Sequence, residues 1–262
     1  TDGINIQNRA ANIRIMGNSI HVVGEGIDTF GIDGLLHNNV IEDALIFSVK
    51  LIHGASGTVV RDNVLDGAGY APIVVAGGHN GSGNTFGNVF YGNELRRIGS
   101  IEQFCGSKTE PMYRLYEACS WAEIMPTPSV EPAAFGVWSA SSNFAPIFNV
   151  FSKNDVFVEQ GSTTIRHLIQ VARATGAPVP YGTIFMSNQL INAGAIPHSG
   201  PCPPVPLTSG SFCDRLDSPS IVDTPSPPDT FLTADFDGDG CKDLYFHWKS
   251  SGHNELYNWQ GA

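Results

Sequence analysis

One short phrase returns six times along the chain: an apolar residue, two other positions, Asn, one other position and a second apolar residue. The first three of these Asn residues are 21 and 24 positions apart, and the later steps are 30, 61 and 34, so sequence is inserted later in the array. A repeat in the low twenties indicates a solenoid, in which each repeat is one coil that buries its apolar face only by stacking on its neighbours. The copies are Ile15–Asn18–Ile20, Leu36–Asn39–Ile41, Val60–Asn63–Leu65, Phe90–Asn93–Leu95, Phe151–Asn154–Val156 and Phe185–Asn188–Leu190.

The phrase predicts short strands that meet at a turn. Alternation places its two apolar side chains on one face, and the Asn lies between them, where the chain must turn. Asn tolerates left-handed backbone angles, and its amide can bond the Asn of the next coil. Gly-Ile openings at Gly3 and Gly26 add a second strand to each coil. We therefore predict an all-β, parallel solenoid in which the six Asn residues form one continuous ladder.

These coils, which read Gly-Ile and then Asn-x-Ile, resemble the right-handed parallel β-helix proteins of the pectate-lyase-like group. The resemblance covers about residues 1–196 and implies a right-handed parallel β-helix solenoid. That scaffold carries lyases, hydrolases, epimerases, adhesins and phage tailspikes, so the resemblance concerns the fold more than the function.

The sequence divides into three parts. In the β-helix, residues 1–196, we expect insertions at about 99–133 and 162–177. The first has the character of a long loop, and the second of a short helix, because Ile165, Leu168 and Ile169 fall at helical spacing with Gly176 behind them. Residues 197–229 are rich in Pro, which predicts a stiff linker without a core of its own. Residues 230–262 form a separate C-terminal unit.

The C-terminal unit carries the run Asp-Phe-Asp-Gly-Asp-Gly-Cys-Lys-Asp. Carboxylates at alternate positions around a Gly turn can converge on one hard cation. We predict one calcium ion held by Asp235, Asp237, Asp239 and Asp243, with the carbonyl of Cys241 as a fifth ligand. The run lacks the Glu that an EF-hand needs at its twelfth position. It is similar to the FG-GAP or VCBS repeat, which implies a small C-terminal calcium-binding repeat.

Composition limits the partners and the compartment. The net charge of −11 argues against nucleic acid, which needs basic stripes. No apolar run approaches the length of a transmembrane segment. Cys105 with Cys119, and Cys202 with Cys213, bracket short irregular segments, which suits disulfides in an oxidising compartment; the alternative is that they are free buried thiols. Cys241 is left over, and we expect a secreted or cell-surface protein.

The strongest candidate site lies in the second and third coils. Asp28 and Lys50 are 22 residues apart, close to one coil, so stacking should make them neighbours, with Glu25 and His53 at the shoulders. A Lys beside carboxylates and a His is what sugar-acid elimination uses, with Lys50 or His53 as the base. To act as the base, Lys50 or His53 must have a lowered pKa. That requires Glu25 and Asp28, whose negative charges would raise it, to be metal ligands or protonated. The alternative is a surface salt bridge with a turn His.

A second column stands three places after each ladder Asn, at His21, Glu42, Asp66 and Arg96. Glu42 and Asp66 on adjacent coils suit a retaining glycosidase pair or a like-charge pair. The alternative is a solvated turn edge.

Two functions are consistent with these features. The first is an enzyme that acts on a polysaccharide or cell-surface glycan by lyase-, hydrolase- or epimerase-type chemistry. The second is a non-catalytic structural or adhesive extracellular protein. Because a bare solenoid end exposes strand edges, we expect the N-terminal coil to be covered, by a second copy in a homo-oligomer or by a neighbouring chain, or to continue a longer protein.

Overall fold

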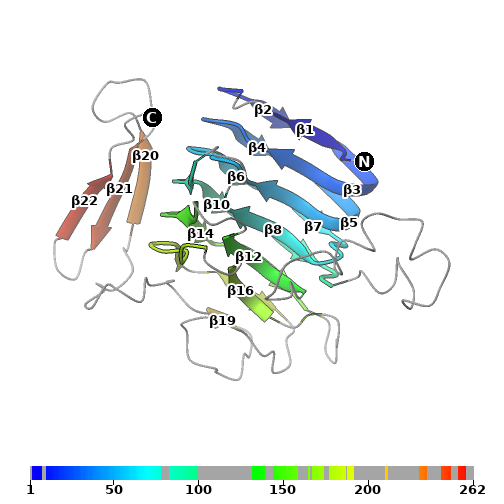
Figure 1. The fold of residues 1–262 in the computed structure, drawn as a ribbon. Helices are drawn as coiled ribbons and strands as arrows, with labels where there is room; N and C mark the ends of the chain where they lie inside the picture. The colour runs from blue at the N-terminus through cyan, green and yellow to red at the C-terminus, as the bar shows by residue number, and fades with distance from the viewer. Residues whose placement is uncertain are drawn as a thin grey trace.

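The computed structural model describes residues 2–7, 10–77, 83–99, 132–139, 144–158, 165, 167–173, 177–186, 188–191, 210–211, 230–234, 243–248 and 253–257. These residues are all-β: they form strands and turns and no helix (Figure 1). Accordingly, no helix among them is long and apolar enough to cross a membrane.

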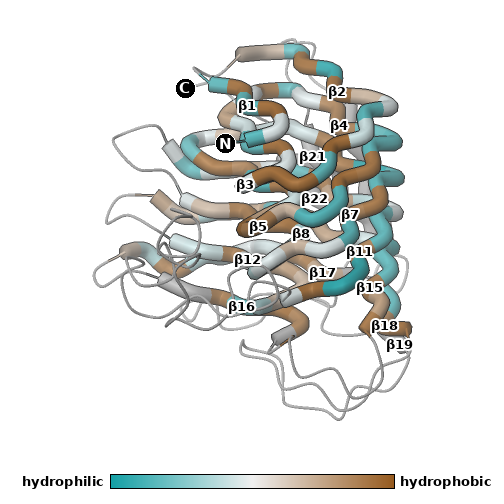
Figure 2. The backbone as a smooth tube through the Cα atoms, turned by 90° about the vertical axis from the view of Figure 1, so that its right-hand side faces the viewer, coloured by the Kyte–Doolittle hydropathy of each residue, from teal (hydrophilic) through white to brown (hydrophobic). Residues whose placement is uncertain are grey.

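The largest sheet is curled, because its longest strand pairs with different neighbours along its two halves. The N-terminal half of β5 (Val40–Leu51) pairs with β7 (Val64–Asp66), and its C-terminal half pairs with β8 (Ala71–Ala76). The strand β3 (Ser19–Thr29) pairs in parallel with β5 along its length, with a register shift between Val23 and Glu25. Figure 2 shows β3, β5, β8, β12 and β16 stacked one below another. The other strands of this sheet are β1 (Ile4–Ile6), β11 (Glu94–Arg96), β12 (Ala133–Ser139), β15 (Asp155–Phe157), β16 (His167–Arg173), β18 (Gln189–Ile191) and β19 (Gly210–Ser211).

A six-stranded parallel sheet lies across the core from the large one. In chain order each of its strands pairs with the next, so that β2 pairs with β4 and β4 with β6, while strands of the large sheet lie between them in sequence. This alternation is compatible with a parallel β-solenoid. The strands are β2 (Arg14–Met16), β4 (Leu35–His37), β6 (Val59–Arg61), β10 (Val89–Tyr91), β14 (Val150–Ser152) and β17 (Ile184–Met186).

Two smaller sheets complete the described strands. β9 (Thr85–Phe86) pairs in parallel with β13 (Pro146–Ile147). β20 (Thr230–Ala234), β21 (Asp243–Trp248) and β22 (His253–Tyr257) form an antiparallel sheet, drawn in orange to red in Figure 1.

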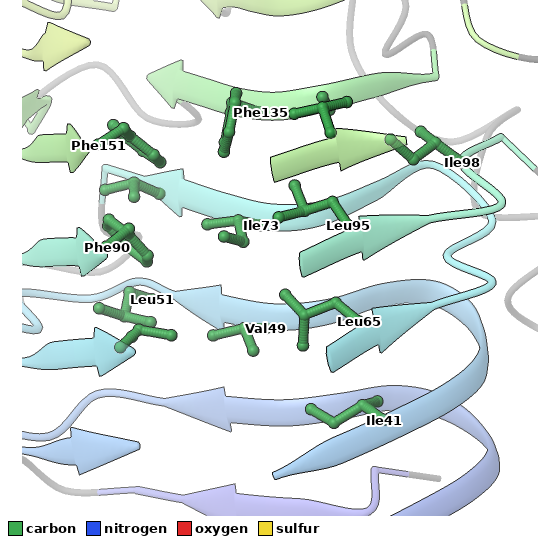
Figure 3. Packing of buried hydrophobic residues seen from close by; sticks show 14 of the residues in the cluster. Ile41, Val49, Leu51, Leu65, Ile73, Phe90, Leu95, Ile98, Phe135 and Phe151 are labelled. Carbon is green, nitrogen blue, oxygen red and sulfur yellow. The ribbon is translucent and has the colours of Figure 1, made fainter. Parts of the chain in front are cut away.

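The core between the two large sheets is built from rows of equivalent side chains. Every coil places the two apolar residues of its repeated phrase inward, where they stack on those of the next coil (Figure 3). The rings of Phe90, Phe151 and Phe185 stack nearly parallel, with centroids 4.5 and 4.6 Å apart. That spacing is close to the distance between neighbouring strands, so the side chains repeat with the backbone.

The predicted Asn ladder is confirmed. The side-chain amide of each ladder Asn donates to the amide oxygen of the next, from Asn18 to Asn188, over 2.8 to 2.9 Å. The same oxygens also accept the backbone N–H of the preceding Asn, as when Asn39 N donates to Asn63 Oδ1. From Asn39 onward the ladder Asn residues are buried. Each buried polar amide is therefore paired, which is the condition for placing it there at little cost.

Two details differ from the sequence prediction. The left-handed backbone lies one residue before the ladder Asn, at Gly17, Asn38, Asp62, Gly92 and Lys153, and not at the ladder Asn itself. A second, unpredicted ladder stands five residues earlier, where Asn88 Nδ2 donates to Asn149 Oδ1 over 2.9 Å. In that column Thr58 takes the equivalent place and accepts from Gly34 N.

The predicted helix within the 162–177 insertion is wrong. Residues His167–Arg173 form β16, which pairs in parallel with β12 in the large sheet. Leu168 and Ile169 are both buried in the core, and pairing with β12 outweighs their helical spacing. The other predicted insertion, at about 99–133, lies mostly outside the described residues, as does the linker, apart from β19.

Changing Asn63 to Ala should lower the free energy of unfolding by roughly 2–3 kcal/mol, because it removes the oxygen that accepts from both Asn39 N and Asn39 Nδ2 and leaves these buried donors without it. Asn18 stands at the end of the ladder and is partly exposed, so Asn18→Ala should cost less than about 1 kcal/mol. Chemical denaturation of both variants measures the difference. Equal losses would contradict the role given to the ladder.

Candidate functional site

The register of β3 on β5 brings the predicted site residues together. Asp28 lies directly opposite Lys50, and Glu25 lies opposite Phe47. The spacing of 22 residues is thus one coil, as the sequence predicted.

Lys50 forms two ion pairs with the carboxylates of the preceding coil. Its Nζ lies 2.5 Å from Glu25 Oε2 and 3.0 Å from Asp28 Oδ2. The side chains are only 14, 10 and 7% exposed for Lys50, Glu25 and Asp28. The three charges are therefore held out of water, where their mutual interactions are stronger than at an exposed surface. The salt bridge that the sequence left open as the alternative is therefore present, but it is buried and does not lie at the surface.

A third carboxylate, which the sequence analysis missed, belongs to the same group. One oxygen each from Asp2, Glu25 and Asp28 lies within 4.8 Å of the others. Asp2 is exposed and accepts a hydrogen bond from Asn5 Nδ2 over 2.5 Å. In the pairing of β1 with β3, Ile4 lies opposite Ile27, so partner residues are 23 positions apart. The same spacing relates Asp2 to Glu25. That spacing was the signal available in the sequence.

An apolar cluster on the outer side of the large sheet borders the charged group. It contains Phe47, Tyr70 and Trp138, with Phe30 partly buried against it. The rings of Phe47 and Trp138 meet edge to face with centroids 5.3 Å apart. Phe47 is the strand partner of Glu25, so apolar side chains stand where water would otherwise solvate the carboxylates.

Burial raises the pKa of Asp28 to about 7, from 3.8. The neighbouring Lys50 ammonium opposes this shift, and the negative charge of Glu25 adds to it. Asp28 Oδ1 is also buried without a hydrogen-bond partner among the described residues. Removal from water penalises the ionised carboxylate, and one ammonium cannot compensate fully for several carboxylates.

The pKa of Lys50 is raised above its ordinary value. Burial alone would lower it, but Glu25 and Asp28 outweigh that effect. Lys50 therefore keeps its proton, whereas Asp28 exchanges one near neutral pH. The group that can transfer a proton at this site is the carboxyl.

His53, the fourth predicted residue, lies just after β5 in a left-handed turn with φ of 58°. Its ring packs edge to face against Phe30, with centroids 4.5 Å apart. Because Phe30 follows Asp28 by two residues, this ring pair borders the charged group on its C-terminal side.

The second predicted column forms as expected, since His21, Glu42, Asp66 and Arg96 are successive strand partners. Each carboxylate of this column already contacts a basic side chain. His21 Nδ1 lies 2.6 Å from Glu42 Oε2, and Arg97 Nε lies 2.5 Å from Asp66 Oδ1. These contacts favour the solvated turn edge, with its carboxylates in ion pairs, over a retaining glycosidase pair.

The remaining sequence predictions lie outside the described residues. These are the calcium ligands Asp235, Asp237, Asp239 and Cys241 and the four bracketing Cys residues. Asp243, the other predicted calcium ligand, is the first residue of β21. Comparison with protein-family models, curated proteins and solved structures gives no match.

Replacing Asp28 with Asn should flatten the dependence of stability on pH. Because the pKa of Asp28 in the folded protein lies above its unfolded value, the folded state binds this proton more tightly. The stabilisation is complete below pH 3.8 and is lost as pH rises through about 7. We therefore expect the melting temperature of the native protein to fall from pH 5.5 to pH 8 relative to Asp28→Asn. Parallel curves for the two proteins would contradict the assigned cause.

Proposed function

We propose that this chain is a secreted or cell-surface parallel β-helix protein that acts on a polysaccharide at Glu25, Asp28 and Lys50. The observation that carries the proposal is a buried carboxyl, Asp28, whose pKa of about 7 suits proton transfer at neutral pH. Perturbed groups of this kind cluster at functional sites. His53 borders the site with Phe30 and is a candidate for substrate contact.

Among the three reaction types, a hydrolase best fits the charges. Protonated Asp28 would donate its proton to the leaving glycosidic oxygen as the C–O bond breaks. An oxygen of Glu25 lies within 4.8 Å of one of Asp28, which leaves no room for an attacking water between them. Glu25 would therefore attack the sugar carbon as the nucleophile, and Asp28 would then take a proton from the water that displaces Glu25 from the sugar. Two carboxyl groups, one acting as the acid and the other as the nucleophile, are a usual means of this reaction.

Elimination fits less well. A lyase needs a base to remove a proton from carbon, and the raised pKa of Lys50 leaves it protonated. For elimination, the sequence required Glu25 and Asp28 to be either metal ligands or protonated. Burial supports protonation, and only for Asp28.

The proposed fold is right-handed, and the alternation of paired parallel strands supports the β-helix.

We further propose that the C-terminal unit is an FG-GAP/VCBS-like repeat that binds calcium through Asp235, Asp237, Asp239, Asp243 and the Cys241 carbonyl. A calcium titration of the full chain should show one site that Asp237→Asn removes; a titration without a site would contradict it.

A structural or adhesive protein is the second candidate. The observation that favours it is the ion triad of Glu25, Asp28 and Lys50, which is largely buried and joins two adjacent coils. In that case the triad would hold the coils in register and do no chemistry.

The two candidates differ in one assay. The native protein, incubated with a broad panel of polysaccharides, should release new reducing ends from at least one of them. Asp28→Asn should lower that rate by about 10²- to 10⁴-fold, because a general acid is lost. Asp155→Asn serves as the matched control, since Asp155 lies on β15, a different part of the large sheet, and should leave the rate unchanged.

Retained activity in Asp28→Asn, with the fold intact by circular dichroism, would remove Asp28 from the mechanism. Absence of activity of the native protein on the whole panel would favour the structural candidate.

A further inference from the structure

We infer that the site takes a glycan bearing free amines, with a substrate ammonium held by the carboxylates of Asp2, Glu25 and Asp28. The inference rests on the function proposed above and names its substrate class.

The charge balance of the site is negative. Asp2, Glu25 and Asp28 face one ammonium, that of Lys50. The net charge is −1 when Asp28 is protonated and −2 when it is ionised. A uronate would bring a further negative charge to this place, and Lys50 is already bound by two carboxylates of its own chain. An ammonium on the substrate instead complements the local charge.

The spacing of the three carboxylates suits an ammonium. A primary ammonium has three donors and no acceptor. Oxygens placed tetrahedrally at about 2.8 Å from one nitrogen lie roughly 4.6 Å apart. One oxygen from each of Asp2, Glu25 and Asp28 lies within 4.8 Å of the others.

Asp28 supplies the second, independent observation. The residue is only 5% exposed, and its Oδ1 has no hydrogen-bond partner among the described residues. A buried oxygen without a donor is costly, so a ligand that donates to it would gain more there than at the surface. When Asp28 is ionised, Oδ1 accepts a donor. When Asp28 is protonated, the proton belongs on Oδ1, because Oδ2 faces the Lys50 ammonium, and Oδ1 then accepts only through its remaining lone pair.

We expect a ligand to approach the site from the side of Asp2. Asp2 is exposed, whereas Glu25 and Asp28 are buried beneath it. On the other side, half-buried Phe30 packs against His53 and offers an apolar face to the C–H groups of a sugar ring. A sugar amine could then lie over the carboxylates while its ring lies on Phe30.

A divalent metal fits the same oxygens less well. Calcium requires several oxygens at 2.3–2.6 Å, as a general rule of its coordination. The Lys50 ammonium already lies 2.5 and 3.0 Å from two of the three residues that would supply them. A doubly charged ion would have to displace Lys50, whereas an ammonium can share the carboxylates with it.

The test is calorimetric binding of three oligosaccharides of equal length to the full chain at pH 7, where Asp28 is about half ionised: a glucosamine oligomer, its N-acetylated form and a galacturonate oligomer. The glucosamine oligomer should bind at least tenfold more tightly than the other two. Asp2→Asn, which leaves Glu25 and Asp28 in place, should remove most of that preference without weakening the N-acetylated oligomer. Asp155→Asn should change neither.

Each outcome either supports or overturns the preference for an amine-bearing glycan. Equal or tighter binding of the galacturonate or N-acetylated oligomer would overturn the inference, and so would calcium binding at Glu25 without any preference for amines. Cleavage of a neutral or acidic polysaccharide that depends on Asp28 would then still support the proposed function. If no oligomer binds and no polysaccharide is cleaved, both fail.

Discussion

The register between coils is the constraint on which the rest of this structure depends. Each ladder Asn donates to the next through side chain and backbone together, so a slip of one residue would break both bonds and turn the apolar rows outward. Because this register is fixed, Ile27 lies on Val49 in the core, and one residue further on Asp28 lies on Lys50 outside it. The candidate site is thus a consequence of the same pairing that builds the core.

The outer face of the large sheet gives that site its chemistry. Lys50 and Asp28 on a bare sheet surface would form an ordinary ion pair of little consequence. Here Phe47, Tyr70 and Trp138 cover the neighbouring positions and remove water. Glu25 and Asp28 then compete for one ammonium, and desolvation raises the pKa of Asp28. Asp28 Oδ1 stays unpaired in this place among the described residues, so it is free to accept a hydrogen bond from a water or a ligand.

The sequence predicted what repeats and missed what does not. The ladder and the pairing of Asp28 with Lys50 follow from spacing alone, because stacking converts a fixed period into contact. The left-handed residue before each ladder Asn was misplaced, since Gly, Asn, Asp and Lys share that position and form no single-letter pattern. The strand β16 was taken for a helix, because its pairing with β12 is a long-range contact that local periodicity does not contain.

The electrostatics of the site were beyond the sequence for the same reason. The ring of Trp138 comes from more than one hundred positions beyond Glu25, and only the fold places it against Phe47. The sequence could state that a base or acid here needs a shifted pKa, but not that burial would shift Asp28 and leave Lys50 charged. Asp2 was within reach of the spacing argument and was overlooked.

The central claim is that Asp28 holds a proton near neutral pH, and its side-chain carboxyl can be titrated directly by carbon-13 NMR, with Asp28→Asn identifying the resonance. A midpoint of about 7 is the expected result. A midpoint near the ordinary value of 3.8 would show that Lys50 keeps Asp28 ionised, and would contradict the assignment of Asp28 as the proton-transferring group.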